Sequence, residues 1–119
     1  MSLDPYEKSL ICARAALAKR ASEPVILQVG KISSVTDYFV IVTGVSSRQV
    51  QTIAQAVEEA LGGNNLHPFG VEGYQDGRWV LIDYLDVVVH VFLEPVRRFY
   101  DLERLWDEAP RLDEAAITG

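Results

Sequence analysis

Two carboxylates and an imidazole lie within an otherwise apolar segment, DYLDVVVH at residues 83–90. Asp83, Asp86 and His90 are residue types of a small metal site or an acid–base pair. Asp86 falls where a turn is expected, and aspartate is common in turns because its side chain bonds nearby backbone. The remaining pair, Asp83 and His90, would need a third ligand or a nucleophile, and the neighbouring sequence supplies neither. The segment therefore favours a contact surface or a structural His–Asp pair over catalysis.

A second candidate site is VTGVSSRQ at residues 42–49, where a strand, a glycine-bearing turn and a capped helix follow one another. Free backbone N–H groups at such a helix start can bind anions. However, the spacing of Gly and Lys in a phosphate-binding loop is missing. The Gly–Ser pair is similar to that of nucleotidyltransferases, but the next acids, Glu58 and Glu59, are adjacent on a helix and point in different directions. A structural turn is therefore favoured over a Mg²⁺ site.

Periodicity predicts the elements that position these residues. We expect helices at residues 5–20, 47–61 and 95–106, and strands at residues 25–29, 38–44, 66–69, 78–84 and 87–94. Asp4 and Ser46 are the expected N-caps of the first two helices. Strands that first alternate with helices and then run antiparallel predict an α/β (α+β) domain, with a small mixed β-sheet flanked by helices.

The last two strands are predicted to form a hairpin with its turn at Leu85–Asp86. One face of this hairpin then carries three cross-strand pairs, Trp79–Phe92, Leu81–His90 and Asp83–Val88. The other face is uniformly β-branched or aromatic and suits a core: Val80, Ile82, Tyr84, Val87, Val89 and Val91. We expect the first, mixed face to be either covered by the C-terminal helix, with Trp106 on Trp79 and Phe92, or exposed to a partner.

The 119 residues suffice for one domain, and their formal charge is −6. An acidic body repels a phosphate backbone, so direct nucleic-acid binding is not expected and a basic protein partner is favoured. The same charge also suits a merely solvated surface. No apolar stretch reaches the roughly 20 residues of a membrane span, and no secretion signal is recognised. The single Cys12 fits a reducing compartment, and a cytoplasmic location is expected.

Three segments in order resemble the ribosomal silencing factor (Iojap-like) family: DYFVIVTGVSSRQV at 37–50, VEGYQDGRWVLIDYLDVVVHVF at 71–92 and RRFYDLERLW at 97–106. The resemblance implies a fold related to the nucleotidyltransferases but without their catalytic acids. We expect residues 1–107 to form the single domain and residues 108–119 to form a flexible tail. The family usually has glycine in place of Leu85, and because leucine resists a positive φ, the hairpin turn is expected to differ.

The resemblance also implies a function without catalysis, cofactor or metal. Members of the family bind the large ribosomal subunit through its ribosomal protein uL14, on the face that meets the small subunit. Occupying this face blocks subunit association and represses translation when nutrients are scarce. The family can also form homodimers, and an unpaired edge strand would allow this, although the sequence does not establish it.

The mixed hairpin face is the contact surface that this function would use. Trp79 is the expected anchor, because tryptophan often dominates interface energetics. Glu72 and Asp83 are expected to pair with basic groups of the partner, and His90 to form a hydrogen bond with it. The expected partner-binding residues are Glu72, Trp79, Leu81, Asp83, Val88 and His90.

Two other classes of function remain open. A nucleotide-binding or nucleotidyltransferase-like enzyme would use the turn at Gly44–Ser47 and would bring acids close to it in the folded chain. A dimeric adaptor would serve another basic protein and would not associate with ribosomes. The missing acid pair argues against the enzyme, whereas only the family resemblance argues against the adaptor.

Overall fold

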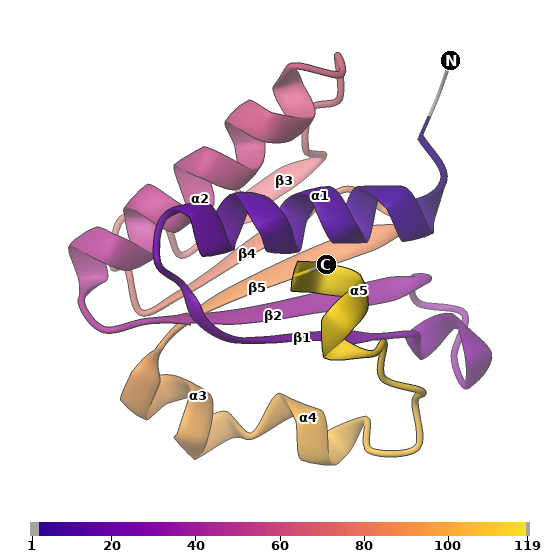
Figure 1. The fold of residues 1–119 in the computed structure, drawn as a ribbon. Helices are drawn as coiled ribbons and strands as arrows, with labels where there is room; N and C mark the ends of the chain where they lie inside the picture. Colours follow the sequence, from indigo (N-terminus) through magenta and orange to yellow (C-terminus); the bar gives the residue numbers. More distant parts are fainter. Residues whose placement is uncertain (1–2, 119) are drawn as a thin grey trace.

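The computed structural model describes residues 3–118 and contains a five-stranded mixed sheet flanked by helices. Residues 1, 2 and 119, which the expected domain and tail include, lie outside the described residues. The strand order is β1-β2-β5-β4-β3, and only the central β2–β5 pair is parallel. Helices α1, α2 and α5 lie on one side of the sheet, and α3 and α4 lie on the other (Figure 1). The predicted fold class is confirmed.

The first helix begins as its capping signals predict. In α1 (Pro5–Ala18), the Asp4 carboxylate accepts a hydrogen bond from the Glu7 amide at 2.8 Å, and proline occupies the first helical turn. The following strand, β1 (Ser22–Leu27), starts earlier than predicted. It ends before a short 3₁₀ turn, η1 (Val29–Lys31), which takes up the end of the segment expected to be a strand.

The central elements match the prediction closely. Every residue of β2 (Tyr38–Gly44) is buried, as expected for a strand covered on both faces. Helix α2 (Ser47–Gly62) is capped by the Ser46 hydroxyl, which accepts from the Gln49 amide at 3.1 Å. Its buried face is the predicted stripe: Val50, Ile53, Ala54, Val57 and Leu61. These elements therefore follow from local sequence signals alone.

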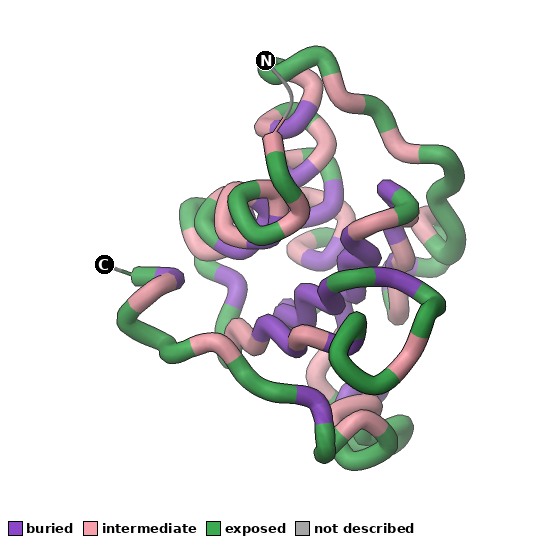
Figure 2. Tube along the Cα trace, turned by 90° about the vertical axis from the view of Figure 1, so that its right-hand side faces the viewer, coloured by how far each residue is buried: buried purple, intermediate pink, exposed green. Residues whose placement is uncertain are grey.

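The two faces of the sheet support two apolar cores. The larger core joins the sheet to α1 and α2 and includes the uniform hairpin face predicted from the sequence, such as Val80, Ile82 and Val89. The smaller core lies under the C-terminal segments and contains Phe39, Ile41 and Phe92. Figure 2 shows buried residues gathered in the strands and exposed residues in the surrounding loops.

The edge strand next to the hairpin differs from the prediction. A strand was expected at residues 66–69, but β3 spans Gly70–Glu72 and pairs with β4 (Trp79–Asp83). Pro68 has no backbone N–H to donate, so the expected segment could not pair along its length. The first bond of the pairing runs instead from the Phe69 amide to the Asp83 carbonyl at 2.7 Å.

The C-terminal helix is broken in two. A single helix was expected at residues 95–106, but α3 (Glu94–Tyr100) and α4 (Leu102–Leu105) are separated by Asp101 at φ +45°. A left-handed residue ends an α-helix, and aspartate tolerates this conformation better than most residues. The chain therefore turns after Tyr100, and the helical faces predicted from continuous periodicity do not apply beyond this point.

A buried arginine joins these helices to the sheet. One guanidinium nitrogen of Arg97 donates to the Glu23 carbonyl and to the Thr43 hydroxyl, both at 2.6 Å. The other nitrogen lies 3.0 Å from the Glu103 carboxylate. Arg97 is only 7% exposed, so this network fixes α3 and α4 against β1 and β2.

The last residues pack on the sheet, which differs from the expected flexible tail. Ala109 and Ile117 are buried, and α5 (Glu114–Thr118) lies against α1, where Arg14 donates to the Ile117 carbonyl at 3.0 Å. The residues before α5 run along β1: the Gln28 amide donates to Pro110, and the Leu112 amide donates to Ile26. This segment covers the outer edge of β1, whereas among residues 3–118 β3 pairs with β4 alone.

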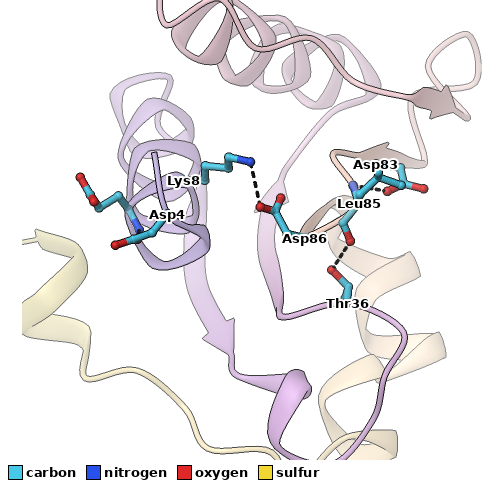
Figure 3. Close-up of polar contacts among 7 residues, drawn as sticks. Asp4, Lys8, Thr36, Asp83, Leu85 and Asp86 are labelled. Atoms are coloured by element: carbon cyan, nitrogen blue, oxygen red, sulfur yellow. Dashed lines mark hydrogen bonds and ion pairs between the residues drawn. The ribbon is translucent and has the colours of Figure 1, made fainter. Parts of the chain in front are cut away.

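The turn between β4 and β5 (Val87–Leu93) keeps a positive φ without glycine. The Asp86 amide donates to the Tyr84 carbonyl at 3.0 Å, and Leu85 lies between them at φ +72°. This is a strained γ-turn. Figure 3 shows the contacts that hold it: Thr36 donates to the Leu85 carbonyl and Lys8 pairs with Asp86. Leu85 therefore adopts a positive φ that leucine disfavours, and the expected difference from glycine-bearing relatives stays a prediction.

Replacing Leu85 by glycine is expected to stabilise the protein by about 0.5–1 kcal/mol, since glycine removes the left-handed strain but increases the entropy of the unfolded chain. Little burial is lost, because Leu85 is 56% exposed. The change is measured as the midpoint of urea unfolding. Leu105→Gly serves as the control. Leu105 is also an exposed leucine, but it lies in the helix α4, where glycine is unfavourable, so this change should destabilise the protein. If Leu85→Gly instead lowered the free energy of unfolding, the backbone of Leu85 would not be strained.

Among the described helices, none is both long enough and apolar enough to cross a membrane.

Candidate functional site

The mixed face of the β4–β5 hairpin is the candidate site, and its register is the predicted one. Trp79 pairs with Phe92, Leu81 with His90, and Asp83 with Val88. The sequence left open whether this face is covered or exposed. The structure shows both conditions, because the residues of β5 are covered and those of β4 are only partly covered.

The covered half lies beneath the C-terminal segments. Phe92 is fully buried, His90 is 4% exposed and Val88 is 9% exposed. The expected seal by Trp106 on Trp79 and Phe92 is wrong in its partner, because the indole of Trp106 contacts the ring of Phe39 at a centroid distance of 5.2 Å. His90 and Val88 therefore lie beneath the surface, and in this conformation they cannot contact a partner as expected.

The open half forms a shallow hollow at the β3 edge. Its volume is about 280 Å³, and its lining consists of Glu72, Gly73, Trp79 and Leu81. Gly73 has φ +80°, and a Cβ atom there would lie 2.1 Å from the Trp79 carbonyl oxygen, so only glycine fits. The indole of Trp79 and the side chain of Leu81 form the apolar part of the hollow, and the exposed residue Glu72 supplies a carboxylate at the rim.

Tyr100 belongs to this surface, although sequence reasoning did not select it. Its ring lies 4.9 Å from that of Trp79, and the residue is 50% exposed. Phe99 beside it is 81% exposed and forms an edge contact with Tyr100. The adjacent aromatic pair at the end of α3 was the only signal in the sequence, and its direction depends on the break at Asp101.

The three polar residues of the opening motif have separate partners. Asp83 accepts a hydrogen bond from the Leu85 amide at 2.8 Å, and Asp86 pairs with Lys8 at 2.8 Å (Figure 3). His90 accepts from the indole N–H of Trp79 at 3.1 Å. Within residues 3–118, no group of three or more His, Cys, Asp and Glu side chains is placed to hold a metal ion. The motif therefore builds a turn and a sheet face.

The buried imidazole of His90 is neutral at ordinary pH. Burial lowers the pKa of His90 from 6.5 to about 4. Its Nδ1 atom accepts the Trp79 hydrogen bond, so the proton lies on Nε2. The Nε2 atom is buried and has no hydrogen-bond partner in the described part of the chain.

This shift predicts a loss of stability in mild acid. The folded state takes up the proton near pH 4 and the unfolded state near pH 6.5, so the free energy of unfolding falls as the pH is lowered between these values. Between about pH 7.5 and pH 5 the loss is about 2 kcal/mol. Urea unfolding across this range measures it. His90→Asn should remove most of this dependence of unfolding free energy on pH. The control, His67→Asn at an exposed position, should leave it in place. If wild type and His90→Asn lost stability equally as the pH falls, the buried His90 would not be the cause.

The second candidate, the turn before α2, has few free donors. The Val45 amide donates to the side chain of Gln49 at 2.7 Å, and the Gln49 amide donates to Ser46. The backbone of Gly77 also approaches so closely that a Cβ atom on it would lie 2.8 Å from the Ser47 carbonyl oxygen. These contacts leave this helix start less accessible to a phosphate group than the sequence suggested.

Comparisons with known proteins agree with this geometry. The family model for the ribosomal silencing factor during starvation matches residues 3–118. The chain belongs to the ribosomal silencing factor family. A ribosomal silencing factor of Bacillus subtilis is 44% identical over 103 residues, which cover 87% of each protein. The chloroplastic Iojap protein of Zea mays is 30% identical over 101 residues, or 85% of this chain and 44% of that protein.

Solved structures of silencing factor relatives share the fold. A crystal structure of a Chromobacterium violaceum protein superposes with a TM-score of 0.86 at 35% identity and covers 88% of both chains. A Bacillus halodurans structure gives 0.76 at 39% identity and covers 87% of this chain and 93% of that one. The silencing factor family is named for a regulatory action on ribosomes and not for a catalysed reaction.

Proposed function

We propose that this protein binds the large ribosomal subunit through the ribosomal protein uL14 and sterically blocks association with the small subunit, which represses translation under nutrient limitation. Membership of the silencing factor family supports a ribosomal partner. The observation that carries the proposal is the half-open face around Trp79, where aromatic and aliphatic groups are only partly covered and lie beside carboxylates.

The chemistry of this face fits a basic protein partner. Trp79 and Leu81 supply apolar area, and the exposed Glu72 and the half-buried Asp83 supply negative charge at the rim. A desolvated aromatic anchor surrounded by polar groups is the usual composition of an interface hot spot. The net charge of −6 steers the protein towards basic surfaces and away from exposed RNA phosphates.

The proposed action requires affinity and volume and no chemistry. The molecule extends 32 × 32 × 28 Å, which is large enough to occupy the space between two surfaces that must meet closely. The protein is therefore proposed to act in the cytoplasm as a non-enzymatic blocker without a cofactor. Homodimerisation, which the family resemblance implies, stays a prediction.

Co-sedimentation with purified large subunits, small subunits and joined ribosomes tests this proposal. We expect association with the large subunit alone, and fewer joined particles when the protein is added before the subunits are mixed. Addition after joining should have a smaller effect, because the contact face is then occupied. Chemical crosslinking from Glu72→Cys should identify uL14 as the neighbour.

Each alternative predicts a different result. An adaptor for another basic protein would not sediment with any ribosomal particle. A nucleotide-binding enzyme would bind a nucleotide with Mg²⁺, and Ser46→Ala at the turn would weaken that binding. Large-subunit binding without any effect on joining would disprove the steric block but retain the partner.

A further inference from the structure

The side chain of Trp79 is fixed from inside the protein. Its indole N–H donates to His90 Nδ1 at 3.1 Å, across a strand pair in which Trp79 lies opposite Phe92. The ring also packs on Phe92 at a centroid distance of 4.8 Å and on Tyr100 at 4.9 Å. The only polar atom of the indole therefore points into the protein, and the ring carbons face the hollow.

The contacts of His90 hold the acceptor in place. The imidazole is parallel to the ring of Phe92, with an interplanar angle of 12°, and it receives the edge of Phe39 at a centroid distance of 4.8 Å. His90 is only 4% exposed, so its imidazole is enclosed by close-packed neighbours. Its orientation is thus set by two aromatic neighbours that belong to the smaller core.

A buried histidine at this position lowers the stability of the folded state, and its Nδ1 atom is useful only as the acceptor for Trp79. Its Nε2 atom is buried without a partner among residues 3–118, and an unpaired buried donor destabilises the folded state. Leucine or phenylalanine would fill the space without this cost. In the described part of the chain, the one hydrogen bond of the His90 side chain is that to Trp79, so this bond is what the imidazole contributes beyond packing.

We propose that His90 is a positioning residue, which orients Trp79 so that the partner meets the indole carbons and not the N–H group. This inference rests on the proposed function, in which Trp79 is the anchor of the ribosome-contacting face. It changes the role expected for His90, from direct contact with the partner to control of the anchor. It also specifies the partner: the site that receives Trp79 is apolar and needs no hydrogen-bond acceptor.

The test compares two substitutions that differ in the acceptor. His90→Asn places an oxygen near the position of Nδ1, whereas His90→Leu fills the space without an acceptor. Indole N–H resonances report the bond directly, and Trp106→Phe identifies which of the two belongs to Trp79. We expect the Trp79 signal to move upfield and to exchange faster with water in His90→Leu, and to stay close to its original position in His90→Asn.

Binding to isolated large subunits provides the functional readout. In His90→Leu the Trp79 side chain is free before binding and must be ordered by the partner. We therefore expect the dissociation constant of His90→Leu to rise by about three- to tenfold, and that of His90→Asn to stay within about twofold of wild type. Should His90→Leu fail to fold, His90→Gln replaces it, since its oxygen reaches past the position of Nδ1.

The outcomes separate this inference from the proposed function. If His90→Leu or its replacement loses the indole shift but binds as wild type does, while Trp79→Ala does not bind, the positioning role is wrong and the contact face stands. If Trp79→Ala also binds normally, the contact face itself is wrong. Equal weakening by both His90 substitutions, with an intact indole resonance in His90→Asn, would also overturn the positioning role.

Discussion

Substitution of Trp79 by alanine is expected to weaken binding to the large ribosomal subunit by about a hundredfold or more, which corresponds to about 3 kcal/mol. The indole provides the largest apolar group in the open hollow, and its neighbours Glu72 and Leu81 cannot replace the lost area. Removing it would leave the hollow filled with water against the partner. Quantitative sedimentation, or titration with a fluorescently labelled protein, measures the change.

Two controls distinguish lost contact from lost structure. Tyr6→Ala removes an exposed aromatic ring from α1, which lies on the other side of the sheet, and should leave binding unchanged (Figure 1). Thermal unfolding of Trp79→Ala should show a loss smaller than the about 3–5 kcal/mol of a fully buried tryptophan, since Trp79 is only half-buried. Glu72→Lys, at an exposed position, should weaken binding without any loss of stability. Normal binding by Trp79→Ala would remove the anchor from the proposal.

Substitution of Arg97 by methionine is expected to lower the free energy of unfolding by about 3–5 kcal/mol. The change leaves the Glu103 carboxylate, with 18% of its side chain exposed, without its positive partner, and it removes the bonds to Glu23 and Thr43. The destabilisation arises mainly from the charge left unpaired, because the methionine retains much of the apolar volume. Urea unfolding measures the difference.

The same helix offers a matched control for the Arg97 prediction. Arg98 is next in sequence, its side chain is 74% exposed, and it lies 3.9 Å from Glu94. Arg98→Met should change stability by no more than about 0.5 kcal/mol, as expected for an exposed ion pair. Adding Glu103→Leu to Arg97→Met should restore part of the loss, since no buried charge then remains unpaired. Similar losses for Arg97→Met and Arg98→Met would show that the network does not stabilise the fold.

The parts of the fold that the sequence predicted are those with local causes. The stripe of α2 and its Ser46 cap lie within 16 residues, and the hairpin register follows from its turn and from strict alternation. The break at Asp101 has no comparable local signal, and it lies between Arg97 and Glu103, whose ion pair joins α3 to α4. Burial of Ile117 depends on α1, about a hundred residues away, and was missed for the same reason.

The candidate site shows the same division. Alternation placed Trp79, Asp83 and His90 on one face, and the structure confirms it. Which part of that face is covered depends on the path of α3 over β5 and β2, which no local pattern encodes. For this reason His90 was expected outside and lies inside, and Tyr100 was overlooked although it borders Trp79.

The unequal edges of the sheet limit how the protein can assemble with itself. A sheet grows into an open-ended fibre only if each added molecule presents a fresh edge for the next one. Here the β1 edge is occupied by the Pro110 and Leu112 backbone, so within residues 3–118 the open sheet edge is that of the three residues of β3. Strand pairing between two copies would consume the open edge of both and stop there. High cellular concentrations should therefore yield pairs and not polymers.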